Sequence, residues 1–385
     1  MSFEFATATR LLFGAGKVAE VPAALRAQGV RRTLVATNLP GPGCARLRSL
    51  LTTAGIESVV FLVDCEPTVD LVSAGRARSR REGCDAVVGL GGGSAMDLGK
   101  AVAALATNEG DPLDYLEVVG RGSPLRARPL PFVAIPTTAG TGAEVTRNAV
   151  IGVPAAKVKV SLRSPHLLPI LAVLDPDLLD GLPRDVVAHS GLDALSHLLE
   201  ALVSSKANPL TDALGTEGLR RSARALRRAY TSGLQAETRE DLMLASLCGG
   251  LCLANGGLGA VHGFAAPLGG MLHAPHGAVC AALLGPVIEA NLRALAEREP
   301  EHPARARYRE IAEIVTGRHG AEAEDGLAWV RDLCQALDVR GLGHHGLSSG
   351  EIPALVAKAK AASSMRGNPV QLSDQELGDI ATCSL

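Results

Sequence analysis

Two residues that could bind a metal ion lie one helical turn apart in the segment GLDALSHLLEAL. Asp193 and His197 are spaced i, i+4, so that on a helix both side chains lie on one face. His262 and His276 follow in VHGFAAPLGGMLHAPHG, where Pro267 and the glycines after it predict a break that lets the chain fold back. Three imidazoles and one carboxylate suit Zn²⁺ or Fe²⁺, whereas Mg²⁺ and Ca²⁺ prefer oxygen ligands. Each histidine alone is more often an ordinary polar residue, so it is the combination that predicts a metal site.

A glycine-rich turn stands between an apolar run and a helical pattern. Gly91, Gly92, Gly93 and Ser94 follow AVVGL and precede AMDLGKAVAAL. Such a turn lets backbone N–H groups approach a phosphate, and the N-terminus of the following helix favours negative charge. The spelling matches neither the usual dinucleotide fingerprint nor the P-loop, and a plain strand-to-helix turn is the alternative interpretation.

A second loop, PTTAGTGAEVT (residues 136–146), follows the apolar run FVAI. It places Thr137, Thr138 and Thr141 beside Gly140 and Gly142. Hydroxyls and flexible backbone after a parallel strand suit hydrogen bonds to a ligand at the carboxyl edge of a sheet. The alternative is a polar loop that binds nothing.

Short apolar runs alternate with helical patterns over the first 180 or so residues. The runs are TLVAT, SVVFLV, AVVGLGG, FVAIPTT and LAVLDP, and the helical stretches include KVAEVPAALRAQG and DLVSAGRARSRREG. This alternation predicts βαβ units, a mostly parallel sheet and an α/β domain over residues 1–180. Long patterns such as DALSHLLEALVSS and EDLMLASLCGGLCLANG then predict an all-helical domain over residues 181–385.

Composition narrows the class of protein and its partners. The 385 residues are 47% hydrophobic and carry 38 basic against 40 acidic residues, a net charge of -2, which disfavours nucleic acid as a partner. The eight cysteines are scattered without a dense disulfide framework, so we expect a reducing, cytoplasmic setting. The N-terminus lacks a secretory pattern, and no uninterrupted apolar stretch is long enough to predict a membrane span.

Several of these segments together resemble the iron-containing (group III) alcohol dehydrogenases. The matching pieces are LLFGAGKV, GGGSAMDLGKAVA, PTTAGTGAEVT, DPDLLDGLP, GLDALSHLLEALVS, ANPLTDAL, ANGGLGAVHG and APHGAVCAALL, in order over most of the chain. The resemblance implies a dehydroquinate-synthase-like fold, in which a Rossmann-like nucleotide-binding domain and a helical metal-binding domain enclose the active site between them. It also implies a homo-oligomer.

The same resemblance assigns roles to individual residues. It implies that Asp193, His197, His262 and His276 bind Fe²⁺ or Zn²⁺, and that Leu253 and Leu258 line the substrate pocket. The cofactor, NAD or NADP, would contact Asn38, Gly92, Gly93, Ser94, Asp97, Thr137, Thr138, Thr141, Asn148 and Lys159. The implied activity is hydride transfer between the nicotinamide and a small alcohol, aldehyde or ketone, with the metal as Lewis acid.

The chain departs from the family pattern at three positions. Ala266 stands where many members have a histidine thought to relay protons, so we expect His273 or water to take that role. Asn38 replaces the acidic residue that NAD-preferring members use to bind the ribose hydroxyls, which leaves NADP open. Glu66 stands where relatives often have Asn.

Two other kinds of function compete with this interpretation. One is a maleylacetate-reductase-like or dehydroquinate-synthase-like enzyme, since these share the fold and nucleotide site. Retention of the four expected ligands and of the GTGAEVT loop disfavours the reductase. The other is a non-catalytic nucleotide- or metal-binding protein, in which Ala266 marks lost chemistry.

Overall fold

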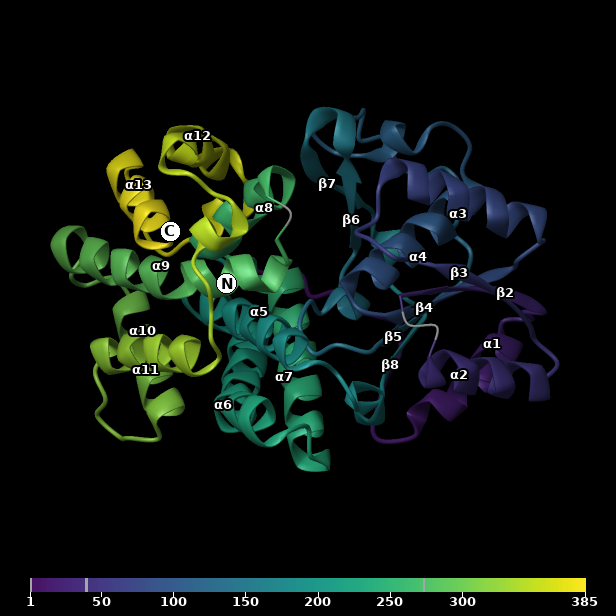
Figure 1. Cartoon of the computed structure of the whole chain (residues 1–385), viewed down its shortest axis with the longest axis horizontal. Coiled ribbons are helices and arrows are strands. Elements are labelled where there is room, and N and C mark those ends of the chain that lie inside the picture. The colour runs from purple at the N-terminus through teal and green to yellow at the C-terminus, as the bar shows by residue number, and fades with distance from the viewer. Residues whose placement is uncertain (1, 39–40, 273) are drawn as a thin grey trace. The chain divides into compact units, whose positions relative to one another are not determined.

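The computed structural model describes residues 2–38, 41–272 and 274–385. The chain forms two compact units, Ala6–Gly181 and Leu182–Leu385, the second of which includes the N-terminal residues up to Phe5. The first unit contains a parallel sheet with helices, and in the described part of the second unit the regular elements are helical (Figure 1). The fold class predicted from the sequence is therefore confirmed.

The first unit is built on six parallel strands. These are β1 (Leu11–Phe13), β2 (Arg32–Thr37), β3 (Glu57–Leu62), β4 (Ala86–Gly91), β5 (Phe132–Pro136) and β8 (Leu171–Leu174). Their order across the sheet is β1-β8-β5-β4-β2-β3. The five apolar runs form β2, β3, β4, β5 and β8, as the sequence predicts. A separate antiparallel hairpin of β6 (Asn148–Val153) and β7 (Val158–Arg163) was not predicted.

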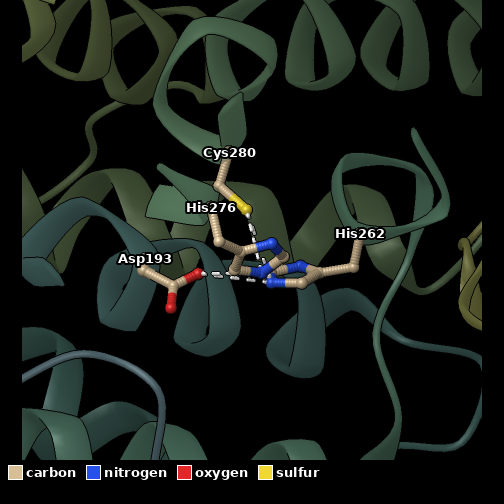
Figure 2. A group of neighbouring side chains, drawn as sticks. All are labelled: Asp193, His262, His276 and Cys280. Carbon is tan, nitrogen blue, oxygen red and sulfur yellow. Dashed lines mark hydrogen bonds and ion pairs between the residues drawn. The ribbon is translucent and has the colours of Figure 1, made fainter. Parts of the chain in front are cut away.

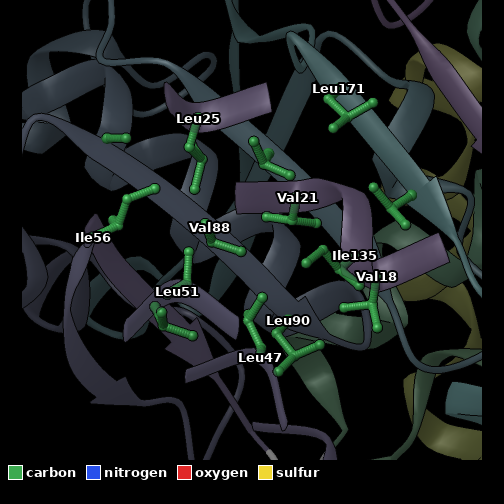
Figure 3. Close-up of a cluster of buried hydrophobic side chains, with 14 of the residues drawn as sticks. Val18, Val21, Leu25, Leu47, Leu51, Ile56, Val88, Leu90, Ile135 and Leu171 are labelled. Carbon is green, nitrogen blue, oxygen red and sulfur yellow. The ribbon is translucent and has the colours of Figure 1, made fainter. Parts of the chain in front are cut away.

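Helices cover both faces of this sheet, which explains why its central strands are apolar throughout. Helices α1 (Val21–Ala27) and α2 (Pro42–Thr53) share an apolar cluster with side chains of β2, β4, β5 and β8 (Figure 3). Helices α3 (Val69–Arg81) and α4 (Gly93–Thr107) pack against each other, and α4 lies on the sheet. The approach of α4 depends on Gly89, where a Cβ would lie 3.1 Å from Met96 Cε and 3.0 Å from Phe132 Cζ.

The direction in which strands are added to the sheet reverses between β2 and β4. From β2 the chain adds β3 on one side and then returns to place β4 on the other side of β2. In open α/β sheets, ligands bind outside the carboxyl ends of the strands at such a switch point. Asn38 directly follows β2, and its Oδ1 accepts a hydrogen bond of 3.3 Å from the N–H of Gly92 at the end of β4. Two predicted cofactor segments therefore meet at the switch point.

The second unit has α5 at its centre, packed against α6, α7 and α9. Its helices are α5 (Arg184–Val203), α6 (Pro209–Ser232), α7 (Ala236–Gly256), α8 (Ala260–Met271), α9 (His276–Arg298), α10 (Ala304–Thr316), α11 (Ala323–Ala336), α12 (Ile352–Ala361) and α13 (Asp374–Cys383). Close packing of α7 on α5 requires Gly249, because a Cβ there would lie 3.2 Å from the Cβ of His197. Because neighbouring helices pack closely around α5, its polar residues Asp193 and His197 are buried.

Two of these helices, α5 and α9, are long and apolar enough to cross a membrane by length and composition alone. The bent pair of α7 and α8 would add one more such span in the described part of the chain. Burial inside the protein accounts for the apolar residues, because 83% of the apolar stretch of α5 and 72% of that of α9 are buried.

The helix break predicted between His262 and His276 is present, but it lies a few residues after Pro267. Helix α8 continues through Pro267 to Met271, and α9 begins at His276 directly after Pro275. A proline inside a helix removes one backbone hydrogen bond. Here Phe264 and Leu268, on either side of the proline, are fully buried, so that tertiary packing overrides the local preference.

A buried lysine connects α4 to the chain that follows β5. The Nζ of Lys100 donates hydrogen bonds to Thr146 O (2.7 Å), Thr146 Oγ1 (2.8 Å) and Asn148 O (2.9 Å). Lys100 is only 1% exposed, and burial lowers its pKa to about 8 against the opposing charges of Asp97 and Glu144. The ammonium therefore stays charged at pH 7 and fixes the end of the second predicted cofactor loop.

We expect Lys100→Met to loosen this loop. The carbonyls of Thr146 and Asn148 would be left without the ammonium donor, at a cost of about 1–3 kcal/mol for each unsatisfied group. Hydrogen–deuterium exchange should rise in the peptide covering residues 146–148, and the melting temperature should fall. Lys157→Met removes the same charge from an exposed position of this unit and serves as control. Equal exchange in both variants would contradict the role given to Lys100.

Candidate metal centre and dinucleotide site

The four residues expected to bind a metal come from three helices of the second unit. Asp193 and His197 lie one turn apart on α5, His262 lies in the first turn of α8, and His276 is the first residue of α9. The Nε2 atoms of His197, His262 and His276 lie 3.8, 3.5 and 3.6 Å from Asp193 Oδ1. The structure thus brings all four side chains to one place.

These spacings fit donor atoms that share one ion. Ligand atoms about 2.1 Å from a tetrahedrally coordinated metal lie about 3.4 Å from one another. Asp193 Oδ1 is buried, and it accepts no hydrogen bond in the part of the chain that the structure describes. Buried carboxylate oxygens normally have a partner, and a cation in this position would supply one. Imidazole nitrogens with a carboxylate oxygen are a donor set for Zn²⁺ or Fe²⁺.

The electrostatics keep Asp193 ionised although it is only 2% exposed. Burial by itself raises the pKa of Asp193, but the charges of His197 and His276 and the adjacent His262 hold the pKa well below its usual value. The carboxylate is therefore ready to bind a cation at neutral pH. The side chain of His276 is 41% exposed, so the cluster is accessible on that side.

Glu200 orients one of the imidazoles, a role that the sequence analysis missed. Its Oε2 accepts a hydrogen bond of 2.6 Å from His262 Nδ1, and its Oε1 accepts one of 2.7 Å from the Val261 N–H. Because an ionised carboxylate only accepts, Nδ1 carries a proton, which leaves Nε2, on the side of Asp193, as the nitrogen that can bind a metal. Metal-binding histidines commonly have such a carboxylate partner. The signal in the sequence was a third polar residue at i+7 from Asp193 on an apolar helix.

Cys280 is a second residue that the sequence analysis did not assign to the site. Its Sγ lies 3.6 Å from His262 Nε2 and 3.6 Å from His276 Nε2. Figure 2 shows the thiol of Cys280 and the carboxylate of Asp193 both directed at the two imidazoles. Candidate ligand atoms of these four residues all lie within 4.8 Å of one another. Cys280 is four residues after His276, a spacing that places it on the same face of α9.

The other residues predicted near the metal lie as follows. Ala266 is exposed on α8, one turn after His262. Leu253 is half-buried on α7, and Leu258 is buried between α7 and α8. His273, the predicted proton relay, lies outside the described residues.

The predicted phosphate-binding turn and the second predicted cofactor loop lie side by side in the first unit. Thr137 N–H donates to Gly91 O at 2.9 Å, which joins the loop after β5 to the turn after β4. A Cβ on Gly92 would lie 3.4 Å from Thr138 Oγ1, and one on Gly93 would lie 2.9 Å from Thr141 Cγ2. Glycine at these positions therefore leaves room at the start of α4, where backbone N–H groups and hydroxyls can bind a phosphate.

The remaining predicted cofactor residues occupy α4 and the hairpin. Ser94 and Asp97 are half-buried in the first turns of α4. Asn148 begins β6, and its Nδ2 donates to Ser161 Oγ at 3.4 Å. Lys159 on β7 forms an ion pair with Glu66, the residue that departs from the family pattern. The structure thus gives Glu66 a partner within the first unit.

Comparison with known proteins decides the family. Residues 8–176 match the sequence profile described as "Iron-containing alcohol dehydrogenase", and residues 187–384 match "Fe-containing alcohol dehydrogenase family, C-terminal". The chain belongs to the iron-containing alcohol dehydrogenase family. The family and activity predicted from the sequence are confirmed, so this protein is an oxidoreductase acting on CH–OH groups with a nicotinamide cofactor.

The relatives of this dehydrogenase are named after different substrates. A choline dehydrogenase of Bacillus subtilis (strain 168) is 34% identical over 378 residues, which cover 96% of this chain and 92% of the relative. The crystal structure of a 1,3-propanediol oxidoreductase superposes with a TM-score of 0.92 at 32% identity and covers 100% of both chains. A sulfoacetaldehyde reductase from Bifidobacterium kashiwanohense, in complex with NAD⁺, has a TM-score of 0.88 at 27% identity and covers 100% and 99%.

We expect Glu200→Gln to weaken metal binding by the dehydrogenase. Glutamine has one acceptor oxygen for the two N–H groups of His262 and Val261, and its NH₂ would oppose the other donor. Loss of such a carboxylate partner typically costs about 10–100-fold in metal affinity. Competition with a chromophoric chelator measures the affinity. Glu217→Gln, an exposed change on α6, should bind metal like wild type, and equal affinity in all three proteins would show that Glu200 does not support the site.

Proposed function

We propose that this dehydrogenase interconverts a small primary alcohol and its aldehyde at a divalent metal held by Asp193, His197, His262 and His276. The observation that carries the proposal is the convergence of three imidazole Nε2 atoms on the buried Asp193 Oδ1. The three relatives named above support this substrate class, because choline and 1,3-propanediol are primary alcohols and sulfoacetaldehyde is an aldehyde.

A divalent ion bound in this cluster would supply Lewis acidity, which lowers the pKa of an alcohol and polarises a carbonyl. The residues of the chain hold the ion and orient its ligands. Asp193 contributes a negative charge that offsets part of the cation's charge, and Glu200 fixes the ring of His262. Oxidation of an alcohol releases a hydride to the nicotinamide and a proton to a base. Since Ala266 cannot accept that proton, we assign its removal to His273 or water.

For the metal we propose Fe²⁺ rather than Zn²⁺. The donor set alone suits both ions. The family description supports iron. We also propose a cytoplasmic location, which the unpaired state of all eight cysteines supports.

Asp193→Asn should abolish both metal retention and turnover. The amide loses the negative charge that binds the cation, while its shape is nearly unchanged. Metal content after iron or zinc loading is measured directly, and formation of NAD(P)H is followed with a panel of alcohols, or its loss with aldehydes and ketones. Asp185→Asn, exposed in the first turn of the same helix, is the matched control. Full metal content and full turnover in the Asp193→Asn variant would exclude the cluster as the metal centre.

The same panel separates the competing functions. Turnover of maleylacetate without turnover of simple alcohols or aldehydes would favour the maleylacetate-reductase-like enzyme. A dehydroquinate-synthase-like enzyme would need NAD without net formation of NADH. Metal-loaded protein that binds the dinucleotide but converts no compound of the panel would favour a non-catalytic binding protein.

For the dinucleotide we propose a site at the switch point that accepts NAD(H) and tolerates NADP(H). The NAD⁺ bound in the sulfoacetaldehyde reductase supports the first part. Asn38 supports the second, because the residue after β2 carries no negative charge to repel a 2′-phosphate.

Asn38→Asp should therefore increase the preference for NAD(H) over NADP(H). A carboxylate would repel the 2′-phosphate and accept hydrogen bonds from the ribose hydroxyls, and we expect a change of about tenfold or more in the ratio of kcat/KM values. Because Asn38 Oδ1 accepts from Gly92, the aspartate can keep that hydrogen bond. Asn38→Ser is the control for loss of size without added charge. An unchanged ratio in Asn38→Asp would place the ribose elsewhere.

A further inference from the structure

Cys280 lies at the metal cluster, yet the expected ligand set does not include it. It sits in the second turn of α9, is fully buried, and directs its Sγ at His262 Nε2 and His276 Nε2, 3.6 Å from each (Figure 2). One thiol hydrogen can serve only one of these nitrogens, and the other contact would need the sulfur to accept from an imidazole N–H.

The distances fit a metal–thiolate bond. For a tetrahedral ion with a sulfur at about 2.3 Å and a nitrogen at about 2.1 Å, the sulfur and nitrogen lie about 3.6 Å apart. Both contacts of Cys280 have this length. A second, independent feature points to a cation at the same place, namely the buried Asp193 Oδ1 that accepts no hydrogen bond among the described residues.

We propose that the Cys280 thiolate is a ligand of the metal in an alternative four-residue set with Asp193, His262 and His276. This inference rests on the metal centre of the proposed function and extends it. The chain then holds two overlapping ligand sets that share these three residues, one completed by His197 and the other by Cys280.

The form of cysteine that binds metals is the thiolate, so the proton of the Cys280 thiol leaves when the metal binds. The carboxylates of Asp193 and Glu200, both buried, already balance the charge of a divalent cation. Geometry, and not charge balance, is therefore what places the thiolate in the ligand set.

The thiolate also changes which metal the site prefers. Sulfur ligands favour zinc, whereas imidazole and carboxylate ligands suit iron and zinc alike. The site should therefore bind Zn²⁺ more tightly, relative to Fe²⁺, than the expected ligand set would alone.

Cobalt(II) gives a direct readout, because a thiolate bound to Co²⁺ produces an intense charge-transfer absorption in the near ultraviolet. We expect wild-type protein loaded with one equivalent of Co²⁺ to show this band. Cys280→Ser should lose the band while retaining the cobalt. Cys334→Ser removes another thiol of the same unit, on α11, and should keep the band. Competition between Zn²⁺ and Fe²⁺ should show at least a tenfold smaller preference for zinc in Cys280→Ser.

X-ray absorption spectroscopy of the zinc-loaded wild-type protein identifies the atoms bound to the zinc. This test needs no variant, so it does not depend on whether the Cys280→Ser protein folds. One sulfur in the first coordination shell supports the proposal. A shell of nitrogen and oxygen alone, with one zinc bound, overturns it and leaves the metal centre itself intact. Wild-type protein that binds no Co²⁺ or Zn²⁺ at all overturns both this inference and the proposed metal centre.

Discussion

The convergence of imidazole nitrogens on one buried carboxylate oxygen is the constraint on which the helical unit depends. An ionised carboxylate is tolerated in a protein interior only when other groups compensate its charge. Asp193 has three imidazoles around Oδ1, and these come from α5, α8 and α9. The lengths and boundaries of these helices therefore have to bring three separate segments to one point.

The packing around α5 satisfies this constraint. Gly249 lets α7 approach the backbone of α5 beside His197, and Glu200 connects the same helix to both the ring of His262 and the amide of Val261. The central helix thus carries two candidate ligands and the carboxylate that orients another one. Its other side chains are mostly apolar and buried, which supplies the rigid support that a metal site requires.

Local patterns in the sequence predicted much of this arrangement, and long-range packing determined the rest. The i, i+4 spacing of Asp193 and His197 was sufficient because both lie on one helix. The contacts of Glu200 with α8 and of Cys280 with two histidines join residues from different helices, and no periodicity encodes such contacts. Pro267 and the glycines after it predicted the break between α8 and α9, but the helix continues past the proline, because packing of its buried neighbours outweighs one lost backbone hydrogen bond. The apolar runs predicted the parallel strands. The hairpin of β6 and β7 escaped detection although β6 contains the run AVIGV, because such a run does not show that the strand pairs with β7 and not with the main sheet.

The position of His276 has a consequence for the kinetics of metal exchange. Asp193, His262 and Cys280 are enclosed, but His276 is the first residue of its helix and a substantial part of its ring is exposed. A ligand at a helix start, with solvent on one side, can rotate away without disturbing the packing of the others. Entry and departure of the ion would then begin with this imidazole, so that small chelators gain access to the ion before the enclosed donors release it. The rate of metal loss would be set by one side chain, while the affinity is set by the whole cluster.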